Sequence, residues 1–289
     1  GGFVISWQSI GQDGDGDGVY AQLYNASGAK NGDEFQVNTY TDGNQSNSSI
    51  TSLNDGGFVI SWWSNDVYAQ LYNASGAKNG DEFLVNTYTM GAQTSPSITG
   101  LNDGGFVISW MSNGQDGSFG GIYAQIYNVS GAKEGHEFQV NTYTASSQLN
   151  PSIASLNDGG FVISWRSYEQ DGDDDGVYAQ IYNASGAKVG DEFLVNTTID
   201  SAQLNPSIAS LNDGGFVISW QSQSLDQDGS FNGIYAQRFD AQGDALGEAA
   251  WEMEEASYGA LSGTAVDLVQ ALSGVTNHTG MIYVTDAPT

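Results

Sequence analysis

The sequence contains no cysteine and very few basic residues. Disulfide bonds, thiolate-bound zinc and cysteine nucleophiles are therefore excluded. Only 6 Lys and Arg residues stand against 34 Asp and Glu residues, which gives a formal net charge of −28. Such a surface repels nucleic acid and anionic lipid and attracts cations, so we expect no nucleic-acid partner.

Long apolar runs are also missing. No stretch approaches the roughly 20 apolar residues that a membrane-spanning helix needs, so we expect no membrane insertion. The sequence opens inside a repeated phrase, GGFVISW, and shows no export signal. We therefore expect it to be part of a longer polypeptide, with any export signal elsewhere in that protein.

The phrase GGFVISW occurs five times. Its first aromatic residue is Phe3, Phe58, Phe106, Phe161 and Phe216, so the spacings are 55, 48, 55 and 55 residues. A fixed period of this size indicates a solenoid, a propeller or an array. The short interval arises because the second repeat reads WWSNDVYAQ where the first reads WQSIGQDGDGDGVYAQ, so it has lost loop residues and kept both flanking strands.

Each full repeat contains four strand-like segments. They read PSIASL, GFVISWQS, VYAQLYN or IYAQIYN, and DEFQVNT, and turn residues separate them. The segment LNDGG suits a tight hairpin between the first two, and NASGAKNGD supplies turn residues between the last two. Four antiparallel strands per repeat predict an all-β protein, a β-propeller of about five four-stranded blades with 55-residue repeats.

The predicted propeller spans residues 1–248, and its first repeat lacks the PSIASL strand. A later segment or sequence outside this chain could supply that strand. In residues 249–289 the repeat decays, and a helix followed by a strand is expected, a short C-terminal α/β extension. We interpret it as a linker or the start of the next module, with a latch on the propeller as the alternative.

The repeated tryptophans are expected in the core. Phe3, Ile5 and Trp7 share one face of their strand, as do the corresponding residues of the other repeats. Both faces are apolar or small, as expected when each blade packs between two others. The alternative is that the tryptophans stack on a ligand. The five residues are Trp7, Trp62, Trp110, Trp165 and Trp220.

An acidic, glycine-rich loop follows the GFVISW strand in most repeats. Alternating carboxylates in a tight loop can converge on one hard cation, and calcium takes 6 to 8 oxygen ligands. We therefore predict calcium as a cofactor, with a solvated acidic turn as the alternative. The candidate ligands are Asp13, Asp15, Asp17, Asp116, Asp171, Asp173, Asp175, Asp226 and Asp228.

A Tyr-Ala-Gln triplet begins the next strand in every repeat. Tyrosine and glutamine two residues apart point to the same face of a strand. Five such pairs could line related sugar pockets, or they could form a buried hydrogen-bond ladder between blades. The pairs are Tyr20 and Gln22, Tyr68 and Gln70, Tyr123 and Gln125, Tyr178 and Gln180, and Tyr235 and Gln237.

The unit QDGxxxGIYAQRFxxxG, followed by EFxVNT and NPSIASLxDGGFVISW, resembles repeats of giant calcium-associated surface proteins of bacteria, which occur beside RTX-type and cadherin-like modules. The resemblance covers residues 1–240, and the acidic loop more loosely resembles the calcium loops of FG-GAP propellers. It implies an adhesin-like or matrix role, an extracellular or cell-surface location, and a surface or matrix glycan or protein as partner.

The sequence contains no constellation that breaks the repeat symmetry as a catalytic site usually does. We therefore expect no enzyme but a calcium-stabilised propeller module of a bacterial surface adhesin or matrix protein that mediates binding. The first alternative is a multivalent, lectin-like carbohydrate-binding propeller. The second is a polysaccharide-active enzyme, which would need two carboxylates at a set separation in a cleft.

Overall fold

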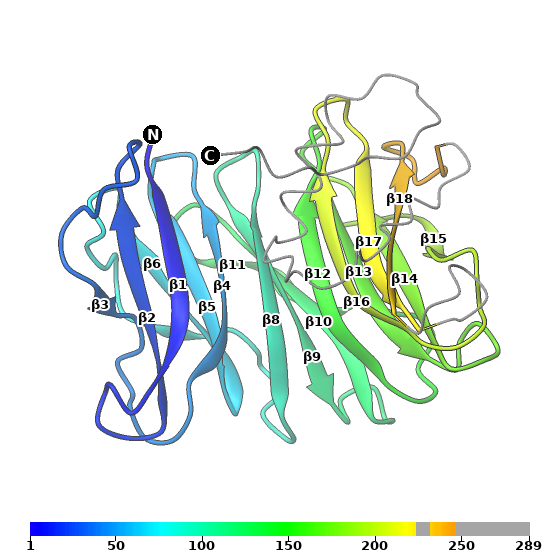
Figure 1. Ribbon diagram of the computed structural model, residues 1–289, viewed down its shortest axis with the longest axis horizontal. Coiled ribbons are helices and arrows are strands. Elements are labelled where there is room, and N and C mark those ends of the chain that lie inside the picture. The colour runs from blue at the N-terminus through cyan, green and yellow to red at the C-terminus, as the bar shows by residue number, and fades with distance from the viewer. Residues whose placement is uncertain (224–231, 247–289) are drawn as a thin grey trace, which may run out of the picture.

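The protein is a β-propeller of five blades. The computed structural model describes residues 1–223 and 232–246, and every regular element in them is a β-strand. These strands form five antiparallel sheets, which we call blades 1 to 5 in chain order (Figure 1). The described residues include no helix long and apolar enough to cross a membrane.

Each blade follows the predicted strand order, from the inner to the outer edge. Blade 1 contains β1 (Phe3–Ile10), β2 (Asp17–Tyr24) and β3 (Phe35–Gln36). Blade 2 contains β4 (Ser46–Ser52), β5 (Phe58–Ser64), β6 (Asp66–Tyr72) and β7 (Phe83–Leu84). Blade 3 contains β8 (Gln93–Gly100), β9 (Phe106–Asn113), β10 (Gly120–Tyr127) and β11 (Lys133–Gln139).

Blade 4 repeats the four-strand plan, and blade 5 repeats its first three strands in the described residues. Blade 4 contains β12 (Gln148–Ser155), β13 (Phe161–Tyr168), β14 (Asp175–Tyr182) and β15 (Lys188–Leu194). Blade 5 contains β16 (Gln203–Ser210), β17 (Phe216–Ser222) and β18 (Gly233–Phe239). The all-β propeller prediction is thus confirmed, whereas the expected α/β extension in 249–289 lies outside the described residues.

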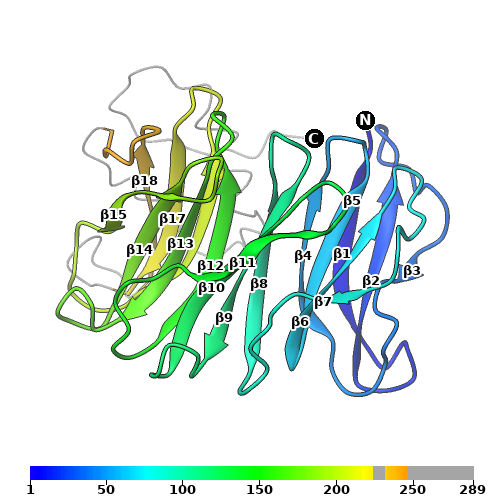
Figure 2. The same ribbon diagram turned by 180° about the vertical axis from the view of Figure 1, so that it is seen from behind.

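The inner strands β4, β8, β12 and β16 lie side by side, each in contact with the next. Figures 1 and 2 show the blades following one another in chain order, with blade 1 and blade 5 at opposite ends of the row. Blade 1 contributes no inner strand of the PSIASL type, because its first strand is β1.

Successive blades pack through two different faces. The face made by the Phe, Ile and Trp of GFVISW and the tyrosines of the next strand packs on an aliphatic face of the preceding blade. In the junction of blades 1 and 2, Phe58, Ile60 and Trp62 contact a cluster that includes Val19 and Ala21. The same arrangement recurs at the three following junctions.

The tryptophans occupy the predicted core at every one of these junctions. Trp62, Trp110, Trp165 and Trp220 are all buried, whereas Trp7 of blade 1 is half-buried. The difference follows from position, since blade 1 is the first of the described blades and its aromatic face packs on none of the other four.

A polar clamp holds the outer edges of neighbouring blades together. In blade 3, Lys133 Nζ donates to the carbonyl oxygen of Val85 at 2.7 Å, and Glu137 Oε2 accepts from the amide of Thr87 at 2.6 Å. Val85 and Thr87 belong to the V-N-T segment of blade 2. The clamp recurs at the junctions of blades 1 and 2 (Lys78, Glu82) and of blades 3 and 4 (Lys188, Glu192).

Further hydrogen bonds join the turns and inner strands of neighbouring blades. Asn54 donates to the carbonyl oxygens of Leu101 and Asn102 in the next blade, and Asn102 and Asn157 repeat this contact one blade further on. Hydroxyl groups of the inner strands also accept from backbone amides of the next inner strand.

The clamp predicts that replacing equivalent lysines in different blades has unequal effects on the free energy of unfolding. Lys133→Met should lower the free energy of unfolding by about 1–2 kcal/mol, because it leaves a half-buried carbonyl group without its donor. Lys30→Met is the matched control, since Lys30 holds the same place in blade 1, the first blade of the row, where no described blade precedes it to supply the carbonyl group. Urea unfolding of both variants measures the difference, and equal effects would contradict a role for the clamp.

The buried tyrosines predict alkaline unfolding. Burial, together with the charges of nearby carboxylates, raises the pKa of Tyr123 and Tyr178 to about 12. Because the unfolded pKa is about 10, their contribution to stability is present below pH 10 and is lost as the pH rises toward 12. Unfolding free energies measured between pH 8 and 12 should fall more steeply above pH 10 for the wild type than for the Tyr123→Phe/Tyr178→Phe variant, and parallel curves would refute this.

Candidate functional site

The inner strands surround a groove of about 520 Å³. Four blades contribute to it through the same short segment, which begins at a left-handed residue in each inner strand. The lining consists of Asn47, Ser48, Ser49, Ser95, Pro96, Ser97, Asn150, Pro151, Ser152, Asn205 and Pro206. A groove of this volume is within the range of small-molecule binding sites.

A β-bulge in each inner strand positions these residues. In blade 4, Leu149 pairs with Arg166 and Ser152 pairs with Ser164, so Asn150 and Pro151 together oppose one residue of β13. Proline suits a bulge because it cannot donate a hydrogen bond to a neighbouring strand. Asn47, Ser95, Asn150 and Asn205 have φ values of 52, 54, 52 and 51°, in the left-handed region.

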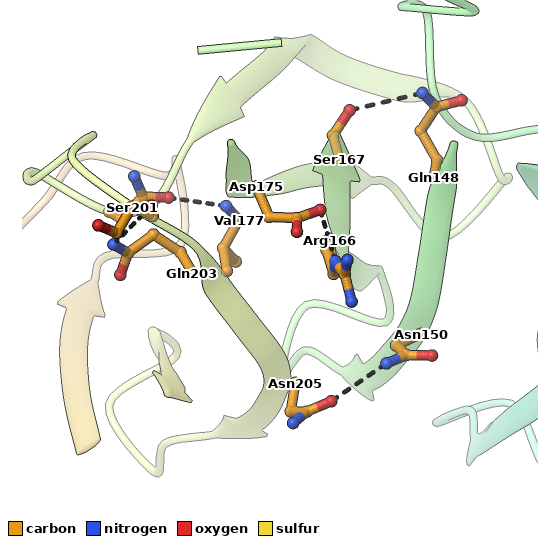
Figure 3. Close-up of polar contacts among 10 residues, drawn as sticks. Gln148, Asn150, Arg166, Ser167, Asp175, Val177, Ser201, Gln203 and Asn205 are labelled. Atoms are coloured by element: carbon orange, nitrogen blue, oxygen red, sulfur yellow. Dashed lines mark hydrogen bonds and ion pairs between the residues drawn. The ribbon is translucent and has the colours of Figure 1, made fainter. Parts of the chain in front are cut away.

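The lining is polar and uncharged. It presents side-chain amides and hydroxyls, and no Asp, Glu, His, Lys or Arg is among the residues that line it in the described part of the chain. Asn150 Nδ2 donates to Asn205 Oδ1 at 3.1 Å, and Figure 3 shows these two side chains directed toward one another from β12 and β16. Such a surface can donate and accept hydrogen bonds but offers no group that titrates near neutral pH.

The sequence interpretation did not identify this groove. It placed the first strand at Pro151–Leu156, whereas β12 begins at Gln148 and passes through the bulge. The available signal was an Asn-Pro-Ser or Ser-Pro-Ser segment at a fixed place in three repeats, which uses three of the four prolines of the chain. Proline within a strand-like segment is itself an indication of a bulge or an edge.

The Tyr-Ala-Gln pairs do not line the groove. Gln22, Gln70, Gln125, Gln180 and Gln237 are all buried, with at most 3% of each exposed. In blade 2, Gln70 Nε2 donates to the carbonyl oxygens of Leu71 and Gly80, so the amide braces the irregular pairing of β6 with the outer segment. The tyrosines Tyr20, Tyr123, Tyr178 and Tyr235 are buried, and Tyr68 is half-buried. The pairs are thus buried, as the alternative of a hydrogen-bond ladder predicts. Their hydrogen bonds, however, lie within single blades and do not join neighbouring blades.

The acidic loop of blade 1 sends its carboxylates to separate partners. Asp13 Oδ1 accepts from the amide of Asp15, Asp15 Oδ2 accepts from the amide of Gly43, and Asp17 Oδ2 accepts from Gln8 Nε2. Asp15 therefore ties the loop to the segment that leads into blade 2.

The acidic loop of blade 4 behaves in the same way. Asp173 Oδ2 accepts from the amide of Ser201 at 2.9 Å, and the buried Asp175 pairs with Arg166 Nε at 2.5 Å (Figure 3). The Arg166 guanidinium supplies the positive charge that Asp175 needs, so this carboxylate has no need of a metal ion.

One oxygen in each of two loops remains without a hydrogen-bond partner. Asp116 Oδ2 and Asp171 Oδ2 are buried and unpaired. Each lies over a glycine, Gly121 or Gly176, so closely that a Cβ there would approach the oxygen to 2.7 or 2.6 Å. These are the loop oxygens to which a cation could still bind.

As arranged, the loops do not fit a calcium site of several carboxylates. Within residues 1–223 and 232–246, no group of three or more His, Cys, Asp or Glu side chains could hold a metal ion. Asp226 and Asp228 lie outside the described residues. Calcium therefore stays a prediction from the sequence.

The loop contacts predict a calcium-independent effect. Asp173→Ala should lower the free energy of unfolding by about 0.5–1.5 kcal/mol, because it removes the acceptor for the amide of Ser201. Thermal unfolding should show this loss equally with a chelator and with calcium at matched ionic strength. Asp174→Ala, one residue further along the same loop, is the control. A loss that develops only in calcium would instead identify Asp173 as a metal ligand.

Comparison with known proteins adds support for the fold. No family model and no curated protein matches the chain. A protein of unknown function from Dyadobacter fermentans is similar in structure, with a TM-score of 0.58 and 10% identity over 85% of this chain and 78% of that one. The Hadza microbial sialidase Hz136 has a TM-score of 0.51 and 9% identity over 81% and 55%.

An α-L-arabinofuranosidase from Lactobacillus brevis is more distant, with a TM-score of 0.46 and 11% identity over 72% of each chain. At these identities the likeness concerns the fold alone, and the assignment of five blades rests on the five antiparallel sheets of the chain itself.

Proposed function

We propose that this chain is a non-catalytic binding module that takes a neutral, polyhydroxylated ligand, a glycan, in the groove between its inner strands. The observation that carries the proposal is the lining of that groove. It consists of amide, hydroxyl and proline groups that four blades supply at equivalent places.

The chemistry of the lining suits sugar hydroxyls. Asparagine offers both a donor and an acceptor, and serine hydroxyls rotate to serve as either. Because neighbouring blades repeat the same groups, a glycan chain that crosses several inner strands would meet a similar set of partners at each one. The Tyr-Ala-Gln pairs are left out of the proposed site because their glutamine amides are buried and bonded within the blades.

Charge favours a neutral ligand over an acidic one. The net charge of −28 produces a negative potential around the protein, which lowers the local concentration of anions. The groove itself provides no Lys or Arg among its described lining residues to offset that potential. Uronic and sialic acid polymers are therefore disfavoured.

The same lining supports binding without hydrolysis. A glycoside hydrolase of the usual kind uses two carboxyl groups, one on each side of the scissile bond. No carboxylate is among the lining residues in the described part of the chain, so a hydrolytic pair would have to be placed elsewhere.

The proposal includes the setting that the resemblance of the repeats implies, a bacterial surface adhesin or matrix protein located outside the cell. A glycan of the surface or matrix is the corresponding partner. Calcium takes no part in the proposed binding step. Its stabilising role is a separate prediction, which the Asp173 variant tests.

The proposal predicts weaker glycan binding when groove amides are removed. Asn150→Gly and Asn205→Gly keep the left-handed backbone accessible and delete the amides. Each should weaken binding of neutral oligosaccharides about threefold to tenfold, because one hydrogen bond contributes about 0.5–1.5 kcal/mol. Ligands found on an array of neutral and acidic glycans would be measured by isothermal titration calorimetry.

Asn65→Gly is the matched control. Asn65 has a φ of 61°, lies in the β5–β6 connection and is not among the residues that line the groove, so the same substitution there should leave affinity unchanged. Equal losses for all three variants, or binding confined to acidic glycans, would refute the proposed site.

A further inference from the structure

Blade 1 presents an aromatic face that no other blade covers. Phe3 is 51% and Ile5 is 47% exposed, whereas the same positions of blades 2 to 5 are at most 4% exposed. Phe3 and Tyr24 nevertheless stack with ring centroids 4.9 Å apart and an interplanar angle of 11°, as Phe58 and Tyr72 do at a covered junction. The face therefore already has the geometry in which blades 2 to 5 receive a neighbour.

The polar and steric parts of a junction are also present on blade 1. Lys30 and Glu34 stand where Lys78 and Glu82 clamp a preceding blade. Glu34 Oε1 accepts from Gln12 Nε2 at 2.7 Å, which is also the distance between the corresponding Gln115 and Glu137. The carboxylate is thus oriented by the same neighbour as in a formed clamp.

The turn between the third and fourth strands of each blade also distinguishes blade 1 from the others. Gly76, Gly131, Gly186 and Gly243 each lie over a Leu or Ile side chain of the preceding blade, so that a Cβ there would contact it. A Cβ on the equivalent Gly28 would meet nothing within 4 Å. Within residues 1–223 and 232–246, no strand pairs with the inner edge of β1, whereas every other blade has such a strand.

The far end of the row is built differently. Blade 5 has Arg238 where blades 1 to 4 have Leu23, Leu71, Ile126 and Ile181, and Arg238 pairs with Asp213. Beside Arg238 that blade carries a buried apolar cluster of Leu211, Val217 and Ala236. The charge of Arg238, at a position where the other blades offer an aliphatic side chain, makes blade 5 a less suitable partner for the face of blade 1.

We infer that the open face of blade 1 (Phe3, Ile5, Trp7, Tyr24, Lys30 and Glu34) is a docking surface for one further blade of the type of blades 1 to 4. That blade contributes an aliphatic Val/Ala/Leu face and a V-N-T segment for the clamp. The inference rests on continuity with the four junctions described above.

A grafted chain tests the inference. A copy of residues 93–158, placed directly before Gly1, supplies blade 3 followed by the inner strand of blade 4, and joins Asp158 to a Gly-Gly pair as in the natural sequence. In this chain Ile5→Asp should lower the Tm by at least about 5 °C, because it places a charge in a buried junction. In the original chain, where Ile5 is half exposed, the same substitution should change Tm by less than about 2 °C.

The copied Ile108 provides an internal control. In the grafted chain it stands at the new open end, so Ile→Asp there should have the small effect that Ile5→Asp has in the original chain. Equal effects of Ile5→Asp in the grafted and original chains would overturn the inference.

A second measurement does not depend on the graft. A synthetic peptide of residues 148–158, added to the original chain, should slow amide hydrogen exchange in β1, and the same peptide with Ile153→Asp should not. Absence of protection by the unmodified peptide would count against the inference. Dimers of the original chain that Ile5→Asp dissociates would show that a second copy covers the face, which would also overturn it.

Discussion

The packing of an aromatic face on the aliphatic face of the preceding blade is the interaction on which the rest of this structure depends. A separate four-stranded sheet of this size has two apolar faces and cannot bury both by itself. Burial of one Phe or Ile side chain contributes about 1.5–3 kcal/mol, and each junction buries several. The clamp, the asparagine contacts and the hydroxyl contacts fix how the blades are oriented in this packing, since each joins a specific group to a specific neighbour.

The same packing produces the groove. Because consecutive blades meet along their inner strands, a bulge at one place in the repeat recurs at adjacent places in space. The polar residues of the bulge then form one continuous surface from four separate segments of sequence. The acidic loops, by contrast, hydrogen-bond to the segments that lead into the following inner strands, as Asp15 does with Gly43 and Asp173 with Ser201. They therefore support the positions of the inner strands.

Most of the fold could be predicted from the sequence, because it depends on features that repeat. The five copies of GGFVISW, the alternation of apolar residues and the turn residues specify the strands and their order, and burial of Trp62, Trp110, Trp165 and Trp220 follows from the position of each between two blades. The acidic loops were harder to interpret. Spacing shows that Asp13, Asp15 and Asp17 are close together in sequence, but it cannot show that their carboxylates bond to three different partners.

The groove could not be predicted because its lining arises from backbone geometry. A strand assignment by alternation places Asn150 and Pro151 on opposite faces, whereas the bulge makes them oppose a single residue and changes the direction of both. The Tyr-Ala-Gln pairs illustrate the converse limit. Their shared face was predictable, but whether that face is open depends on the neighbouring outer strand, which covers the glutamine amides.

Comparison of the five repeats within this single chain separates packing from function. Residues that pack between blades are nearly invariant among the repeats, and the exposed Asp residues of the loops vary from one repeat to the next. The bulge residue follows neither pattern. It is Asn or Ser at all four places, although its φ of 51–54° lies where glycine is the unstrained choice and the chain contains 39 glycines, many of them at other left-handed positions.

A left-handed serine such as Ser95 has a conformational cost that a glycine would avoid. Asparagine adopts the left-handed region more readily than most non-glycine residues, so the cost is smaller at the other three positions. Asn150 and Asn205 bond to one another, and the side chains of Asn47 and Asn205 remain exposed. Asn65, Ser146, Glu169 and Ser201 are also left-handed and do not line the groove, so the backbone angle alone does not mark the site. What distinguishes the four groove positions is that each presents a hydrogen-bonding side chain at the same place in its blade.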